Sequence, residues 1–208
     1  MCLVLKKLTT GGDILIGHYT GWIVYPGFRN NIGNPSPMHV IYSIGHSTRS
    51  FEELLAMLRS FDIKILADIR AYPGSRRYPH FNKDSLEQTL PAAGIKYLHF
   101  KELGGRRKPA KDSKNTAWRN EAFRGYADHM ETPEFKTAAN SLMKYAEETC
   151  VAYKCSEAVW WRCHRALLSD YLKIRNWNVM HIMSVGKSEE HPYTGAAKIL
   201  DGHLSYSQ

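Results

Sequence analysis

Apolar residues along the chain recur with two different periods, and the two periods alternate from residue 38 onwards. Short apolar runs rich in β-branched residues predict buried strands, whereas apolar residues three and four positions apart predict amphipathic helices. The predicted strands cover residues 39–44, 64–69, 96–100, 150–154 and 178–183. Strands separated by helices are typical of a parallel sheet with right-handed crossovers. We therefore expect a single α/β domain, with a mostly parallel sheet of about five strands and helices on both faces.

Capping residues and glycine mark the predicted helix boundaries. Ser50 and Glu53 form a capping box ahead of one apolar stripe, and Asp84 with Glu87 marks the start of a short helix that stops near Gly94. Further helices are expected over residues 123–130, 132–146 and 165–176, and a terminal hairpin is expected to turn at residues 201–202.

The first 37 residues carry no sustained period and are interrupted by glycine and proline pairs. Regular patterning begins at Met38. We interpret residues 1–37 as an N-terminal extension that is disordered or non-native, and residues 38–208 as the α/β domain.

Composition points to a globular protein, because hydrophobic residues make up 43% of the chain and charged residues 23%. No stretch reaches the roughly 18 uninterrupted apolar residues that span a bilayer. The four cysteines show neither the density of a secreted disulfide scaffold nor the paired spacing of a zinc site. We expect a cytoplasmic protein with free thiols, no membrane partner, no metal and no cofactor; the oligomeric state is left open.

The net charge of +8 is concentrated in one part of the chain. Between Arg70 and Arg124, lysine and arginine far outnumber aspartate and glutamate, and this segment carries almost the whole excess. Concentrated positive charge favours a phosphate-bearing partner such as a nucleotide or a nucleic acid. A solvated basic loop explains the charge equally well.

The segments with the most reactive side chains each follow a predicted strand. They cover residues 43–50, 68–82, 101–109 and 155–165. All strand ends of one polarity lie on the same edge of a parallel sheet, and ligands bind outside the carboxyl ends. We therefore expect these four loops to converge on one cleft.

The last of these loops carries the sharpest candidate chemistry. Cys163 and His164 stand where a helix begins, next to Arg165. Helix N-termini and nearby cations lower the pKa of a thiol, which makes Cys163 the candidate nucleophile, although a buried packing role is equally consistent. Cys155 and Glu157 are expected to position these groups, to supply a general base, or, for Cys155, to form a redox pair with Cys163. A metal site ranks lower, because the Cys-x7-Cys-His spacing matches no standard zinc pattern.

The other loops supply cations and flexible backbone. Asp68 is a candidate partner for one arginine, Gly104 and Gly105 permit close approach of a ligand, and His46 is a candidate acid or base. Guanidinium groups bind phosphate through paired hydrogen bonds. The predicted phosphate ligands are Arg70, Arg76, Arg77, Arg106, Arg107 and Arg165.

Several long motifs occur in order: SIGHSTR at 43–49, ADIR with PGSRR and HFN within 67–82, GIKYLHFKELGGRR at 94–107, FRGYADHM at 123–130 and CSEAVWWRCHRALLSDYL at 155–172. With these motifs the chain resembles the bacterial and archaeal domain-of-unknown-function family 488. The resemblance implies a small cytoplasmic α/β protein. It places the shared residues at Gly45, His46, Ser47, Arg70, Arg76, Arg77, Phe81, Gly104, Gly105, Cys155, Glu157, Cys163, His164 and Arg165.

Two functional hypotheses follow. The first is an enzyme acting on a phosphate-bearing substrate, in which Cys163 is the nucleophile or redox thiol and His164, Glu157 or His46 moves protons. The second is a non-catalytic nucleic-acid-binding module, in which the Cys-His-Arg loop cradles an anion.

Overall fold

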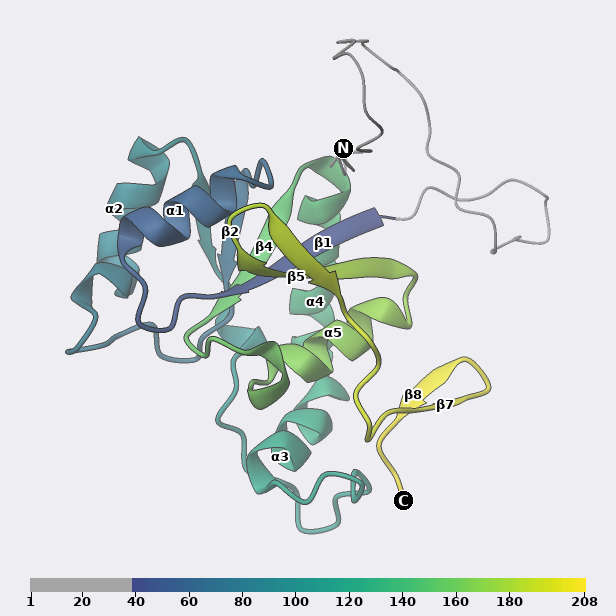
Figure 1. The fold of residues 1–208 in the computed structure, drawn as a ribbon. Helices are drawn as coiled ribbons and strands as arrows, with labels where there is room; N and C mark the ends of the chain where they lie inside the picture. Colours follow the sequence, from purple (N-terminus) through teal and green to yellow (C-terminus); the bar gives the residue numbers. More distant parts are fainter. Residues whose placement is uncertain (1–38) are drawn as a thin grey trace, which may run out of the picture.

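The computed structural model describes residues 39–208, so the proposed N-terminal extension lies outside the described residues. A mostly parallel six-stranded sheet has the order β3-β2-β4-β1-β5-β6. Its central strands β2, β4, β1 and β5 run through the domain (Figure 1). The strands of this sheet are β1 His39–Gly45, β2 Ile65–Asp68, β3 Lys96–His99, β4 Val151–Cys155, β5 Trp177–Ser184 and β6 Lys187–Glu190. The first five are parallel and correspond to the five predicted strands, which confirms the predicted fold class.

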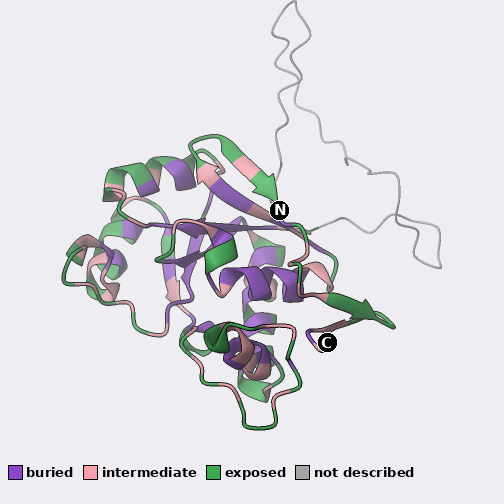
Figure 2. Ribbon diagram, turned by 60° about the horizontal axis from the view of Figure 1, so that its bottom comes forward, coloured by how far each residue is buried: buried purple, intermediate pink, exposed green. Residues whose placement is uncertain are grey.

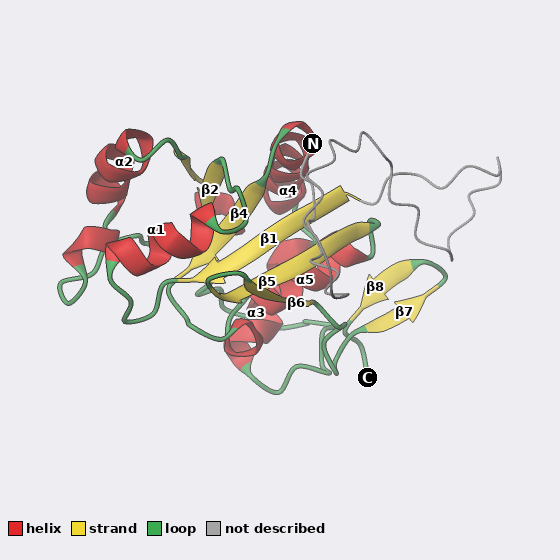
Figure 3. Ribbon diagram, turned by 45° about the horizontal axis from the view of Figure 1, so that its top comes forward, coloured by secondary structure: helices red, strands yellow, loops and turns green. Residues whose placement is uncertain are grey.

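Helices cover both faces of the sheet (Figure 3). Their bounds are α1 Phe51–Arg59, α2 Lys83–Ala92, α3 Glu121–Met130, α4 Pro133–Glu148 and α5 Arg165–Lys173, with short 3-10 turns η1 Pro79–Phe81, η2 Lys101–Leu103 and η3 Trp160–Arg162. One core cluster joins α1 and α2 to the sheet, and the other joins α3, α4 and α5 to the opposite face. Both faces are therefore buried, as the continuous apolar strand runs predict.

Most helix starts agree with the capping signals. The Ser50 capping box is present, and the Thr132 hydroxyl accepts from the N–H group of Phe135 at 3.3 Å. The expected capping box at Asp84 is wrong, because α2 begins earlier, with Asn82 as its N-cap. The preceding turn η1 ends at Asn82, whose carbonyl accepts the first helical hydrogen bond, so Asp84 lies inside the first turn.

Two antiparallel elements complete the fold. The edge strand β6 was not predicted, because its sequence KSEE has no apolar run; a charged, exposed strand at the edge protects the sheet from pairing with another chain. The predicted terminal hairpin is present as β7 Lys198–Leu200 and β8 His203–Ser205. Asp201 and Gly202 both have positive φ angles at its turn, which favours the Asp-Gly pair found there.

The interior strands are almost fully buried (Figure 2). Their register aligns Gly45 with Cys155 and Asp68 with Lys154 at the carboxyl ends. The candidate residues after β1, β2 and β4 thus begin at one level of one sheet edge. No helix among residues 39–208 is long and apolar enough to cross a membrane.

Candidate active site

The loops after the parallel strands meet at the carboxyl edge of the sheet, as expected. Backbone pairing continues past the strand ends: the N–H group of His46 donates to the carbonyl of Cys155 at 3.2 Å, and that of Ile69 donates to the carbonyl of Lys154 at 3.0 Å. The loops after β1 and β2 therefore flank the loop after β4.

The loop after β3 joins them through two glycines. A Cβ atom on Gly104 would lie 2.7 Å from the Cα of Ala71, and one on Gly105 would lie 2.8 Å from Nδ1 of His164. Both distances are too short for any larger residue without movement of the neighbours. The role of these glycines is thus close packing of three loops, which brings Gly105 against the His164 ring.

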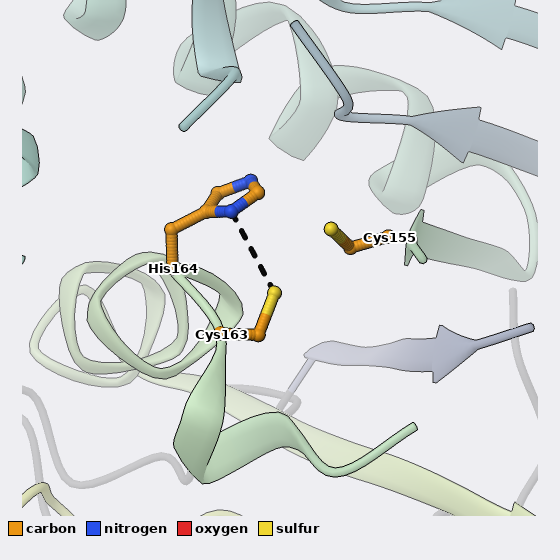
Figure 4. A group of neighbouring side chains, drawn as sticks. All are labelled: Cys155, Cys163 and His164. Carbon is orange, nitrogen blue, oxygen red and sulfur yellow. Dashed lines mark hydrogen bonds between the residues drawn. The ribbon is translucent and has the colours of Figure 1, made fainter. Parts of the chain in front are cut away.

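Two thiols and one imidazole form the centre of the site (Figure 4). Sγ of Cys155, Sγ of Cys163 and a ring nitrogen of His164 all lie within 4.8 Å of one another. Sγ of Cys163 is 3.6 Å from Nδ1 of His164. On the other side of the ring, Nε2–H of His164 donates to the carbonyl of Ile69 at 3.2 Å. That bond places the proton on Nε2 and leaves the lone pair of Nδ1 facing the sulfurs.

The two thiols have pKa values shifted in opposite directions. The hydrogen bond from Cys163 is the main reason that the pKa of Cys155 lies well below the usual thiol range, and the positive charge of Arg165 acts in the same direction. Burial is the main reason that the pKa of Cys163 lies well above that range, and its hydrogen bond with Cys155 and the charge of Cys155 add to the shift. The pair thus holds one proton between two sulfurs.

This result differs from the sequence-based expectation, which gave the lowered pKa to Cys163. Cys163 does precede the first turn of α5, and an N–H group of that turn, from Arg165, favours its thiolate. Its side chain is only 5% exposed, however, and that of Cys155 only 7%. Burial and the neighbouring charge outweigh the helix terminus, so the first thiolate forms on Cys155.

Arg165 is buried and holds the loop between β4 and α5. Its guanidinium donates to the carbonyls of Glu157 at 2.6 Å and Ala158 at 3.2 Å. The Glu157 carboxylate is exposed and accepts from the N–H group of Ala158 at 3.1 Å. In this arrangement Arg165 orients the loop, and its hydrogen bonds go to protein carbonyls.

Asp68 lies at the centre of a buried ionic cluster on the other face of the sheet. Its carboxylate accepts from Nε of Arg70 at 2.8 Å, from Nζ of Lys154 at 3.3 Å and from the Tyr97 hydroxyl at 3.0 Å. Burial alone would raise the pKa of Asp68, but the charge of Lys154 and the hydrogen bonds and charge of Arg70 hold it well below its usual range. The expected pairing of Asp68 with an arginine is confirmed.

Arg70 and Lys154 are both committed to this cluster. Arg70 also donates to the carbonyl of Phe81 at 2.7 Å and is 6% exposed. Lys154 is fully buried, and burial lowers its pKa to about 8 even though Asp68 opposes the shift. Sequence reasoning missed Lys154, because a strand buried on both faces shows no alternation that would mark an inward-facing lysine.

His46 lies beside the same cluster. Its ring stacks on Phe81 with a centroid separation of 4.2 Å, and neither ring nitrogen has a hydrogen-bond partner. Burial and the positive charges of Lys154 and Arg70 lower the pKa of His46 to about 2. The imidazole is therefore neutral throughout the physiological range, and it cannot serve as a charged acid.

The remaining predicted phosphate ligands lie nearer the surface. Arg76, Arg77 and Arg106 are exposed, whereas Arg107 is half-buried and donates from Nε to the carbonyl of Gly104 at 3.1 Å. Arg106 follows Gly105, which contacts His164. Of the exposed arginines, Arg106 is therefore the one that the chain places next to the thiol cluster.

A second buried network was not foreseen. The Ser43 hydroxyl lies 2.5 Å from Nδ1 of His181, His181 lies 2.9 Å from His191, and His191 donates to Asp170 at 2.9 Å. Trp160 stacks on His181 with centroids 4.5 Å apart. Burial, with His191 and Arg165, lowers the pKa of His181 to about 2. The polar residues of this network are widely spaced along the chain, so no sequence motif marked them. Through the stacking of Trp160 on His181, the network supports the loop that carries Cys163.

The best-defined hollows among the described residues lie away from the thiols. One of about 570 Å³ is lined by His99, Glu102 and residues of α4, and another of about 380 Å³ lies between α3, α5 and β8. Neither includes Cys155, Cys163 or His164. The predicted convergence of loops is present, but the thiols are covered rather than exposed in an open cleft.

The fold and the site define a parallel α/β protein with paired thiols and an imidazole at the carboxyl edge of its sheet. Residues 50–172, more than half of the chain, match the model of the family described as Domain of unknown function DUF488, and the chain belongs to this family. The resemblance expected from the motifs is thus confirmed. No curated protein and no solved structure matches the chain.

Replacing Asp68 tests the ionic cluster. Asp68→Asn leaves Arg70 and Lys154 with uncompensated buried charge, so we predict a loss of about 3–5 kcal/mol in the free energy of unfolding. Asp62→Asn is the matched control, because Asp62 forms an exposed ion pair with Lys64 and its loss costs about 1 kcal/mol or less. Urea denaturation followed by circular dichroism measures both; equal effects would contradict the buried cluster.

Replacing His46 tests its neutral state. The folded pKa of about 2 lies below the unfolded value of about 6.5, so the unfolded chain binds more protons and stability falls as the pH is lowered below about 6.5. His46→Phe keeps an aromatic ring on Phe81 and removes this term. We predict unchanged or higher stability at pH 7, and a pH slope between pH 6 and 4 that is smaller by up to about 1.4 kcal/mol per pH unit. An unchanged slope would show that His46 is protonated in the folded protein.

Proposed function

We propose that the protein is an enzyme that acts on a phosphate-bearing substrate, a nucleotide or a nucleic acid, through a thiolate of the Cys155–Cys163 pair. One observation carries the proposal: Nδ1 of His164 faces Sγ of Cys163 at 3.6 Å while Nε2–H is held by the Ile69 carbonyl. A nucleophile, a base and a group that orients the base are the parts of a nucleophilic catalytic site.

The two thiols have different roles in this proposal. The lowered pKa of Cys155, caused chiefly by the hydrogen bond from Cys163, makes Cys155 the sulfur that carries negative charge at rest. Cys163 retains a proton that Nδ1 of His164 can accept, and this transfer makes Cys163 a second nucleophile or a redox partner of Cys155. His164 is the candidate that moves protons, since His46 is buried as a neutral ring and Glu157 binds its own loop.

Binding of phosphate in this proposal rests on the accessible arginines. Arg76 and Arg77 are exposed in the loop after β2, Arg106 is exposed in the loop after β3, and the half-buried Arg107 follows Arg106 in that loop. Guanidinium groups donate paired hydrogen bonds to phosphate oxygens. Arg70 and Arg165 act indirectly, because their hydrogen bonds fix the loops from which the other arginines project.

A non-catalytic nucleic-acid-binding module is the second candidate function. It is favoured by one contrast: the thiols are covered, whereas several arginines of the same edge are exposed. A sequence-independent binder neutralises phosphates with such side chains and needs no reactive group.

Thiol reactivity tests the enzyme. We predict that iodoacetamide alkylates Cys155 of the reduced protein with a pKa below the usual thiol value of about 8.5. Cys163→Ser removes the thiol that donates to Cys155 and should raise that pKa. His203→Ala, which removes an exposed imidazole of β8, should leave it unchanged. Mass spectrometry of the alkylated peptides gives the site. In assays on nucleotides and phosphate esters, the Cys155→Ser and Cys163→Ser variants should bind the substrate without turning it over. Ordinary pKa values for both thiols would contradict the proposal.

Salt dependence and arginine substitution test the binding module. If the protein is a binding module, its affinity for a fluorescent oligonucleotide falls steeply as the salt concentration rises, and Arg106→Gln weakens binding. Both cysteine variants then bind as tightly as the wild type, and neither the variants nor the wild type show turnover. Arg59→Gln is the control, because Arg59 is an exposed arginine at the end of α1. Fluorescence anisotropy between low and physiological salt measures the slope, and a flat response would exclude nucleic-acid binding of this kind.

A further inference from the structure

The three donor atoms at the sheet edge are spaced as ligands of one metal ion. A tetrahedral zinc ion with bonds of about 2.3 Å to sulfur and about 2.0 Å to nitrogen separates those two ligand atoms by about 3.5 Å. Sγ of Cys163 and Nδ1 of His164 are 3.6 Å apart. Sγ of Cys155 completes a triangle whose members all lie within 4.8 Å (Figure 4). Small side-chain adjustments suffice to close this triangle around an ion.

The second nitrogen of His164 has the partner that metal-bound histidines usually have. Such histidines donate their other N–H group to a carboxylate or a backbone carbonyl, which fixes the tautomer and turns the free lone pair toward the metal. Here Nε2–H of His164 donates to the Ile69 carbonyl. Gly105 lies against the ring at Nδ1, where any side chain would collide with it. The ring is thus held on both sides, in an orientation that presents Nδ1 to the sulfurs.

The surroundings of the sulfurs also suit a cation. Both thiols are more than nine-tenths buried, and two adjacent thiolates would repel each other strongly in such a place. A divalent ion bound between the two sulfurs displaces the remaining proton and removes this repulsion. The buried guanidinium of Arg165 directs its hydrogen bonds to the carbonyls of Glu157 and Ala158, and neither of these bonds goes to a sulfur.

We propose that Cys155, Cys163 and His164 bind one thiophilic divalent cation, with zinc the best match for two thiolates and an imidazole. Three protein ligands leave the fourth tetrahedral position for water or for an oxygen of a substrate, which is the arrangement of catalytic rather than structural zinc sites. Sequence spacing gave little sign of it, because two ligands are adjacent residues and the third ends a strand. This inference goes beyond the proposed thiol enzyme and does not depend on it, since metal binding requires no substrate.

Cobalt(II) is the probe, because its complexes with thiolates absorb in the near ultraviolet through sulfur-to-metal charge transfer. We expect the full chain, reduced with a phosphine and freed of metal, to develop this absorption and to saturate at one cobalt per chain. Added zinc should abolish the absorption by displacing cobalt. Absence of the band in the wild-type protein overturns the proposal, and this measurement needs no variant.

Three variants locate the ion. Cys155→Ser, Cys163→Ser and His164→Ala should each weaken cobalt binding by at least about tenfold, and the two serine variants should also reduce the charge-transfer intensity. His203→Ala is the matched control, because it removes an exposed imidazole elsewhere in the domain. Circular dichroism of each variant confirms folding. A band that persists unchanged in both serine variants places the metal elsewhere and overturns the assignment.

The proposed metal site and the proposed thiol enzyme can be refuted independently of each other. Zinc that occupies the site should protect both cysteines from iodoacetamide, and a chelator should restore their reactivity. If cobalt does not bind while the thiols still show a lowered pKa, the metal site is refuted and the thiol enzyme stands. If cobalt binds but turnover survives both serine substitutions, the thiol enzyme is refuted and the metal site stands.

Discussion

The carboxylate of Asp68 compensates two buried cations, and the ends of three neighbouring strands depend on it. Lys154 comes from β4, Tyr97 from β3, and Arg70 from the loop that follows β2. Because an unpaired charge inside a protein costs several kcal/mol, these groups have no alternative arrangement of similar energy. Arg70 also donates to the Phe81 carbonyl, and Ile69, which stands between Asp68 and Arg70, presents its carbonyl to Nε2–H of His164. An ionic cluster on one face of the sheet thereby orients an imidazole on the other.

A second set of contacts holds the loop between β4 and α5, which carries Cys163 and His164. Trp160 stacks on His181, which belongs to a chain of buried polar side chains that ends at Asp170. Arg165 ties the same loop to the start of α5 through two backbone carbonyls. The segment that carries Cys163 and His164 is therefore fixed at both ends. Such pre-organisation is what a reactive or metal-binding constellation requires, because small displacements of its members weaken it strongly.

Much of this arrangement follows from the sequence. Periodicity predicts all five parallel strands, and the geometry of parallel sheets then places four loops at one edge without any motif. The pKa order of the thiols could not be predicted, since it depends on the distance between Cys155 and Cys163 and on their burial. Lys154 could not be recognised as a buried cation, because its strand is buried on both faces and shows no alternation. The pairing of His181 with His191 could not be predicted either, because no local sequence motif marks it. These features depend on contacts between residues that are far apart along the chain. A single sequence does not show which distant residues are in contact.

The account depends above all on the orientation of the His164 ring between the Ile69 carbonyl and the two sulfurs. Both the proposed thiolate chemistry and the proposed metal site need Nδ1 unprotonated and directed at the thiols. Nitrogen-15 NMR of the histidine-labelled, reduced and metal-free protein at neutral pH measures the tautomer directly, with His164→Ala to assign the signals. The account predicts a neutral ring protonated on Nε2, whose Nδ1 signal shifts when the cysteines are alkylated. A ring protonated on Nδ1 instead, or a signal insensitive to alkylation, would contradict it.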